Sequence, residues 1–237
     1  MRKGIMMFAG GFLAAALLAG PGKADPGSDV NTKIERIYEL LYPLQGAKSP
    51  APGLPPSYTA NRVEAFRIMR TLPEENQEEL KTLFLPAIPL DCLESTTYPL
   101  RSCYNTEAQI PAAQAVLSYA EASWALEIDE FGFWAPTTVD SSGATSPGMN
   151  FYLGDTRSIG ASGYTSPEEE DLSTPRGDCV SYIVIDEQMR VEDVAEWKSV
   201  VGHEFNHGCQ MAMDCFETIT SMEGTATWVM PYIVPGD

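Results

Sequence analysis

The sequence predicts an α+β fold in which a small mixed sheet packs on a long helix. Residues 111–128 carry apolar residues at helical spacing and predict that long helix. Residues 150–154 and 180–186 are short and rich in β-branched and aromatic residues, as strands are. A second helical pattern covers residues 194–207, and a further helical stretch begins near residue 223. Together these segments favour the α+β class.

The composition excludes several classes of protein. Hydrophobic residues make up 44% of the 237 residues, which is ordinary for a globular protein and rules out collagen-like and low-complexity chains. The chain has 15 Lys and Arg against 33 Asp and Glu, a formal charge of −18. Because so acidic a chain repels nucleic-acid phosphates and anionic lipid headgroups, we expect neither nucleic acid nor a membrane surface as a partner.

Residues 1–24 are typical of a secretory signal peptide. Arg2 and Lys3 give a positive start, residues 5–18 are apolar and Ala-rich, and small residues precede an expected cleavage before Asp25. The apolar run of about 14 residues is shorter than the roughly 20 that span a bilayer, and no later segment is apolar enough to do so. We therefore expect a secreted protein without a membrane span.

The rest of the chain divides into two expected regions. Residues 25–105 hold three helical patterns and a proline-rich linker over residues 43–56, and we interpret this region as a helical accessory segment or pro-segment. The alternative is that it forms the first layer of the main domain. Residues 106–237 are the expected main domain.

Export places the five cysteines where disulfide bonds can persist. Cys92 and Cys103 flank a short proline-containing loop, and we expect them to be bonded to each other. Cys179, Cys209 and Cys215 then leave one further pair and one odd thiol. The sequence alone does not choose among these three.

Residues 203–207 have the pattern H-E-x-x-H within the second predicted helix. The pattern uses both histidines of the chain, His203 and His207, which lie one turn apart on one helix face. Two neutral imidazoles in this arrangement can bind one Zn²⁺, and Glu204 beside them can act as a general base. The pattern is short, so a disulfide-stapled scaffold with an accidental H-E-x-x-H remains an alternative.

A catalytic zinc site needs a third protein ligand and leaves a fourth position open. No third histidine exists, so we expect a downstream carboxylate from Asp214, Glu217 or Glu223. Asp214 follows His207 by seven residues, which is about 10 Å along a helix and too far. Glu217 falls where the chain must turn, whereas Glu223 opens a helical stretch that can fold back. Glu223 is therefore the expected ligand, with Glu217 as the alternative.

This part of the sequence resembles the gluzincin zinc metallopeptidases. The string H-E-F-N-H is followed by Gln210 and then by E-G-T-A-T-W from Glu223. This is similar to exported bacterial members with H-E-x-x-H-x-x-Q and a downstream E-x-x-A-x-W. The resemblance covers about residues 105–232 and implies a zincin-like fold, with an active-site helix followed by a ligand helix.

The resemblance also implies a function, namely a secreted zinc-dependent peptidase that acts on a polypeptide substrate. His203, His207 and Glu223 would bind one Zn²⁺, and Glu204 would be the general base. The strand before the motif helix, residues 181–185, would be the edge strand that binds an extended peptide by β-augmentation.

Some features depart from thermolysin-like relatives. Those enzymes carry an Asp four residues after the ligand glutamate, where this chain has Thr227. No further histidine is present to stabilise the oxyanion, so Tyr232 is the first candidate, followed by Tyr182 and Tyr164. The sequence also stops soon after the ligand helix, where relatives carry another subdomain, so a C-terminally incomplete domain is one interpretation. An exported protein that binds zinc without catalysis is therefore a second alternative.

Overall fold

The computed structural model describes most of the chain. The described residues are 26–42, 58–139, 144–171, 174, 176–189 and 192–234. The expected signal peptide, residues 1–24, and the expected linker, residues 43–56, lie outside the described residues.

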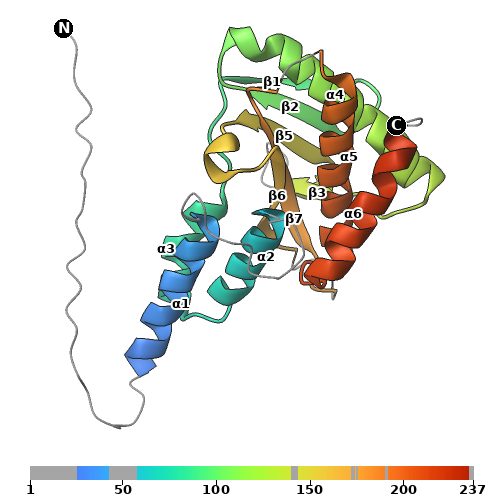
Figure 1. Cartoon of the computed structure of the whole chain (residues 1–237). Helices are drawn as coiled ribbons and strands as arrows, with labels where there is room; N and C mark the ends of the chain where they lie inside the picture. The colour runs from blue at the N-terminus through green and yellow to red at the C-terminus, as the bar shows by residue number, and fades with distance from the viewer. Residues whose placement is uncertain are drawn as a thin grey trace, which may run out of the picture.

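A mixed sheet of five strands forms the centre of the molecule (Figure 1). Its strands are β1 (Asp91–Glu94), β2 (Leu100–Tyr104), β5 (Met149–Gly154), β6 (Gly163–Glu170) and β7 (Cys179–Asp186). Their order is β1-β2-β5-β7-β6, with β2, β5 and β7 parallel and an antiparallel strand at each edge. A separate ribbon pairs β3 (Thr137–Val139) with β4 (Thr145–Pro147). The predicted α+β class with a small mixed sheet is confirmed, as are both predicted strands.

Three helices follow β2 along the chain and build the main layer. α4 (Ile110–Trp124) continues as a π-helix (Ala125–Glu130), α5 is Val194–Met211, and α6 is Ile219–Ile233. α4 and α5 pack on the sheet through one apolar core, while α6 packs against α5 (Figure 1). The predicted long helix and the predicted motif helix are therefore confirmed.

Local sequence explains where α4 and α6 begin. Pro111 stands in the first turn of α4. Backbone N–H groups there have no acceptor within the helix, so the N–H that proline lacks costs no helical hydrogen bond. Thr218 is the N-cap of α6, and its hydroxyl accepts a hydrogen bond from the Ser221 N–H. The cap at Thr218 lets the chain start a new helix shortly after α5 ends.

The N-terminal helices form a second packed region, which we call the N-terminal helical unit. It comprises α1 (Pro26–Leu41), α2 (Tyr58–Met69), α3 (Glu74–Lys81) and a 3₁₀ turn (Thr82–Phe84). Its buried residues share one core with four residues of the main domain, namely Cys179, Met211, Cys215 and Met222. The unit is therefore packed onto the end of α5 and the start of α6.

The sheet begins before the expected domain boundary. β1 and β2 precede residue 105 but belong to the five-stranded sheet, because β2 pairs with β5. The expected boundary at residue 105 therefore cuts through the sheet, whose first strand starts at Asp91. These strands are short and carry Asp, Glu and Arg, which hides the apolar pattern on which strand prediction depends.

The expectation that residues 181–185 form an edge strand is wrong. They lie in β7, which is buried along its whole length and pairs with β5 on one side and β6 on the other. The edge strand next to α5 is β6, whose proline and run of glutamates suit an edge position. The nearly continuous apolar run of β7 is instead typical of a central strand.

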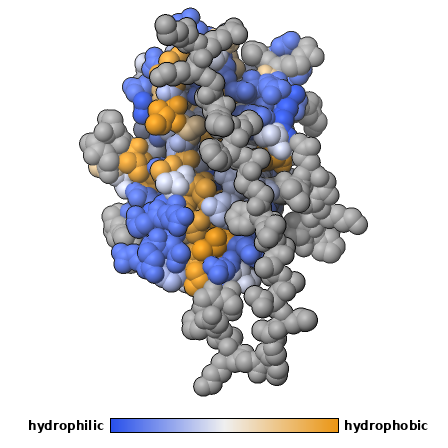
Figure 2. All heavy atoms as spheres, turned by 90° about the vertical axis from the view of Figure 1, so that its left-hand side faces the viewer, coloured by the Kyte–Doolittle hydropathy of each residue, from blue (hydrophilic) through white to orange (hydrophobic). Residues whose placement is uncertain are grey.

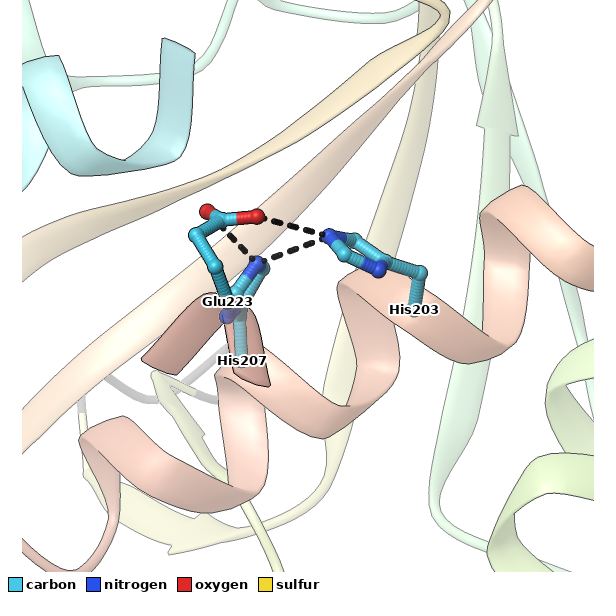
Figure 3. Close-up of side chains that lie close together, drawn as sticks. All are labelled: His203, His207 and Glu223. Carbon is cyan, nitrogen blue, oxygen red and sulfur yellow. Dashed lines mark hydrogen bonds and ion pairs between the residues drawn. The ribbon is translucent and has the colours of Figure 1, made fainter. Parts of the chain in front are cut away.

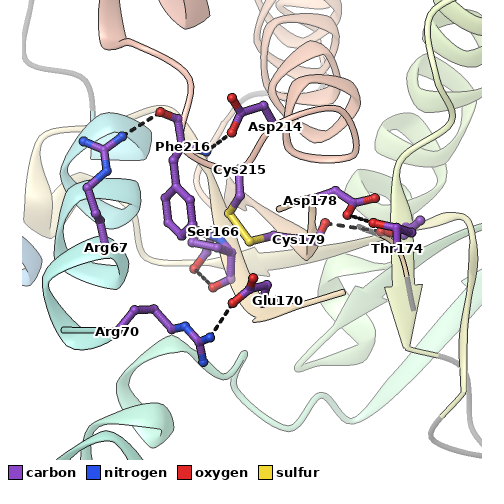
Figure 4. Close-up of a disulfide and its surroundings, with 12 residues drawn as sticks. Arg67, Arg70, Ser166, Glu170, Thr174, Asp178, Cys179, Asp214, Cys215 and Phe216 are labelled. Carbon is purple, nitrogen blue, oxygen red and sulfur yellow. Dashed lines mark hydrogen bonds and ion pairs between the residues drawn. A yellow bond between two sulfur atoms is a disulfide. The ribbon is translucent and has the colours of Figure 1, made fainter. Parts of the chain in front are cut away.

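Two disulfide bonds hold the chain. Cys92 and Cys103 join directly paired positions of β1 and β2, which confirms the expected pair. Cys179 at the start of β7 is bonded to Cys215 in the turn after α5 (Figure 4), and Cys209 is a buried free thiol. The two bonds are consistent with an extracellular protein.

The surface is mixed in character. On the face shown in Figure 2, hydrophobic areas lie between larger hydrophilic ones. Apolar atoms contribute more than half of the accessible surface of folded proteins in general, so exposed hydrophobic side chains need no special explanation. Within the described ranges, no helix combines the length and the apolar character that a membrane span requires.

Candidate metal centre

The two histidines are presented by α5. Trp197, Val201 and Phe205 are fully buried in the main core and fix which side of α5 faces the sheet. His203 and His207 occur at i and i+4, so both imidazoles lie on another side of the helix, next to α6 (Figure 3). His207 is fully buried, while His203 keeps 19% of its side chain exposed.

The structure brings Glu223 to these histidines. His203 Nε2 and His207 Nε2 are 3.1 Å apart, and the Glu223 carboxylate oxygens lie 3.4 Å from His203 Nε2 and 3.5 Å from His207 Nε2 (Figure 3). One donor atom from each residue lies within 4.8 Å of the other two, so the group could hold a metal ion. We call His203, His207 and Glu223 the ligand cluster.

The other two candidate carboxylates have local partners in the turn before α6. Asp214 Oδ1 accepts a hydrogen bond of 2.9 Å from the Phe216 N–H, and Glu217 Oε1 accepts one of 2.7 Å from the Thr218 N–H. Neither residue belongs to the ligand cluster. The helical stretch that folds back therefore supplies the carboxylate, as the sequence reasoning expected.

A close approach of two helices positions Glu223. Gly202 directly precedes the first histidine, and a Cβ atom there would lie 1.9 Å from Ile233 Cδ1 of α6. Because Gly202 has no side chain, α6 can pack directly on α5 at this point. Glu223 lies near the beginning of the same helix, so this packing helps to set its distance from the histidines.

Gln210 links the two helices of the ligand cluster. Its Oε1 lies 2.8 Å from His207 Nδ1, and its Nε2 donates a 2.9 Å hydrogen bond to the carbonyl oxygen of Met222. An amide oxygen accepts, so Nδ1 carries the proton and Nε2 of His207 presents its lone pair to the cluster. In the sequence, Gln210 stands out only as part of the H-E-x-x-H-x-x-Q pattern. Its position three residues after His207 on the same helix is what could have indicated the contact between the two side chains.

Glu204 has partners from two distant segments. It is 6% exposed, and its Oε2 accepts a hydrogen bond of 3.1 Å from the Thr59 hydroxyl of α2. The Thr165 hydroxyl of β6 lies 2.9 Å from the same oxygen and 2.8 Å from the Glu204 carbonyl oxygen. Neither threonine could be identified from the sequence, because no pattern connects them to the motif.

Asn206, inside the motif, is held by a buried carboxyl group. Its Nδ2 donates a 2.8 Å hydrogen bond to Glu127 Oε2, at the end of the long helix. Glu127 is 0% exposed, and burial raises its pKa to about 8 although the bond from Asn206 opposes the shift. Glu127 is therefore largely protonated at neutral pH.

The electrostatic environment of His207 favours a positive charge. Burial lowers the pKa of His207, but a hydrogen bond from the imidazole to the Glu223 carboxylate and the charges of Glu204 and Glu223 outweigh burial and raise the pKa. The same carboxylates would attract a cation between the imidazoles.

The candidate oxyanion residues have other neighbours. Tyr232 of α6 is half-exposed; its ring meets Phe131 edge-on and lies tilted against Trp228 of the same helix. Tyr182 accepts a 3.3 Å hydrogen bond from Arg62, and the Arg62 guanidinium lies over the Tyr164 ring. An oxyanion role for any of these tyrosines stays a prediction.

Comparisons with known proteins found no matching family, no similar curated protein and no similar solved structure. The resemblance to gluzincins therefore stays a prediction that depends on the motif residues.

Proposed function

We propose that this chain is a secreted zinc-dependent peptidase in which His203, His207 and Glu223 bind one Zn²⁺ and Glu204 is the general base. The observation that carries the proposal is the triangle of donor atoms in the ligand cluster. A zincin-like fold, with α5 as the active-site helix and α6 as the ligand helix, is part of the same proposal.

The donor distances support zinc. Zn²⁺ binds imidazole nitrogen and carboxylate oxygen at about 2.0–2.2 Å, usually with tetrahedral geometry, which separates neighbouring donors by about 3.3–3.6 Å. The three separations of 3.1, 3.4 and 3.5 Å lie close to this range. Three protein ligands also leave the fourth position free, as catalytic zinc sites do.

The side chains around the cluster suit hydrolysis of a peptide bond. Bound Zn²⁺ would polarise the scissile carbonyl group and lower the pKa of water at the site. Glu204 takes a proton from the attacking water and returns it to the leaving amine. Gln210 keeps the His207 imidazole in the tautomer that leaves Nε2 free to bind.

One observation favours a second candidate, an exported protein that binds zinc without catalysis. The Thr165 N–H, on the edge strand β6, donates a 2.9 Å hydrogen bond to the Thr59 hydroxyl. A peptide bound by β-augmentation would use such outward N–H groups. In this candidate the N-terminal helical unit takes the place of substrate at that position.

Metal analysis and a casein assay test the proposal. We expect one zinc per chain in the purified protein and hydrolysis of unfolded casein that a chelator abolishes and added Zn²⁺ restores. Glu204→Gln should keep the zinc and lose about 10²–10⁴-fold in rate, because general-base catalysis contributes that much. Glu217→Gln, the same change outside the cluster, is the matched control and should behave as the unmodified protein. Zinc without hydrolysis would favour the second candidate, and a protein without zinc would contradict both.

A further inference from the structure

The contact between Thr59 and Glu204 is part of a directed chain of hydrogen bonds. The Thr165 N–H donates to Thr59 Oγ1 at 2.9 Å, and Thr59 Oγ1 donates to Glu204 Oε2 at 3.1 Å. Because the Thr59 hydroxyl accepts one bond, its own proton is free to point at the carboxylate. All three residues are buried. We call this chain of hydrogen bonds the Glu204 relay.

Arg62 fixes the helix that carries Thr59. It lies three residues further along α2 and is 5% exposed. Its Nε donates a 2.6 Å hydrogen bond to Ser166 Oγ on β6, and its Nη2 donates a 2.9 Å bond to the Leu83 carbonyl oxygen. The guanidinium also lies 5.2 Å from the centroids of the Phe84 and Tyr164 rings. One turn of α2 is thus tied to the edge strand beside Thr165.

Further contacts join the N-terminal helical unit to the turn before α6 and to the end of β6. Arg67 donates a 2.7 Å hydrogen bond to the Phe216 carbonyl oxygen, and Arg70 forms an ion pair with Glu170 (Figure 4). The unit also shares its apolar core with Met211 and Met222, which lie near the ligand cluster in sequence. So extensive a shared core indicates a permanent part of the folded protein.

We propose that the N-terminal helical unit completes the active site and that Thr59 is a positioning residue for Glu204. This inference depends on the proposed peptidase function. The relay and the Thr165 hydroxyl both reach Oε2. Oε1 is bonded to neither threonine and is the oxygen left to accept the proton of the attacking water. A carboxylate held at one oxygen loses less orientational freedom when the reaction occurs, and small displacements of a catalytic group are costly. The unit therefore supports catalysis and does not act as an inhibitory plug.

The test compares Thr59→Val, which removes the hydroxyl but keeps the branched shape, with Thr59→Ser, which keeps the hydroxyl. Thr71→Val, at an exposed hydroxyl just beyond the other end of α2, is the matched control. Each full-length protein is loaded with Zn²⁺ and assayed on fluorescein-labelled casein for kcat and KM, after circular dichroism confirms that it is folded. A second measurement, the orientation of Glu204 in crystals of each metal-free variant, does not need activity.

We expect Thr59→Val to lower kcat by about 10–100-fold, as loss of a supporting hydrogen bond at a catalytic group commonly does, with KM within twofold and zinc content unchanged. Thr59→Ser should recover most of kcat, and Thr71→Val should match the unmodified protein. In crystals, the Glu204 carboxylate should lose its single orientation only in Thr59→Val.

Two results would overturn the inference. An unchanged kcat with an unmoved Glu204 in Thr59→Val would show that the relay does not position the base. A higher kcat would show that the contact blocks the site. If the unmodified protein does not cleave casein at all, the peptidase function fails, while the Glu204 orientation in metal-free crystals still decides whether Thr59 positions it.

Discussion

The ligand cluster and the surroundings of Glu204 are built from different parts of the chain. The cluster uses two residues of α5 and one of α6, and Gln210 joins these two helices. Glu204 instead depends on Thr165 of β6 and on Thr59, which lies 145 residues away in sequence. We therefore expect metal binding and catalysis to respond to different substitutions. Changes in the α5–α6 pair should remove the metal, whereas changes in α2 or β6 should leave it bound.

The largest effect is expected from breaking the cluster itself. His207→Ala removes a fully buried ligand and should leave less than about a tenth of a zinc per chain after dialysis, because a catalytic zinc site needs three protein ligands. Casein hydrolysis should disappear with the metal. Zinc content is measured by mass spectrometry.

Asp214→Asn is the control for His207→Ala, because Asp214 follows α5 but lies outside the cluster. It should keep one zinc per chain. Full zinc in His207→Ala would show that the metal is bound elsewhere.

The next largest effect concerns the disulfide beside the cluster. The Cys179–Cys215 bond closes a sequence separation of 36 residues, so replacing both cysteines with alanine should lower the free energy of unfolding by about 4 kcal/mol. Because Cys215 lies in the turn that leads to Glu223, zinc affinity should fall as well. Urea unfolding and a competition titration with a chelator measure the two effects.

The second disulfide supplies the matched control. Cys92–Cys103 spans a separation of 11 residues, between two strands at the far edge of the sheet from β6. Its removal should cost about 3 kcal/mol and leave zinc affinity unchanged. Equal losses of zinc affinity in both variants would mean that general destabilisation, and not the turn, controls the metal site.

The parts of this site that could be predicted are those set by local spacing. His203 and His207 follow from one turn of helix, and Glu223 follows from a helix that must fold back. The Cys179–Cys215 pair could not be predicted, because it depends on where the turn after α5 meets the start of β7. No local sequence pattern identifies Thr59 as a partner of Glu204, since only the tertiary packing of α2 on β6 brings the two residues together. The expectation that residues 181–185 form an edge strand is wrong for a similar reason. The order of strands in a mixed sheet cannot be read from the sequence of any single strand.

A smaller effect should follow when the link between the two cluster helices is cut. Gln210→Leu removes the acceptor for His207 Nδ1 and the donor to the Met222 carbonyl oxygen. Zinc affinity should fall by about 10–100-fold, which is typical for a partner of a metal-bound histidine. Competition with a chromophoric chelator measures this zinc affinity. Gln114→Leu, an exposed position on α4, should have no effect, and an unchanged affinity in Gln210→Leu would show that the tautomer is set in another way.

The smallest effect concerns Asn206 and its partner Glu127, which lie beside the cluster but do not bind the metal. Burial raises the pKa of Glu127 from its ordinary value of 4.5 to about 8 in the folded protein. Between these values the folded chain keeps a proton that the unfolded chain has lost. This group's contribution to stability is therefore present at low pH and is lost as pH rises, by up to about 1.4 kcal/mol per pH unit.

Glu127→Gln has no proton to lose, so the free energy of unfolding of the unmodified protein should fall relative to that of Glu127→Gln between pH 6 and pH 7. Urea titrations with zinc present measure both proteins, and parallel curves would show that Glu127 is charged in the folded state. Zinc affinity should be the same in the two proteins at pH 6, because the change reaches Asn206 and leaves the imidazoles in place.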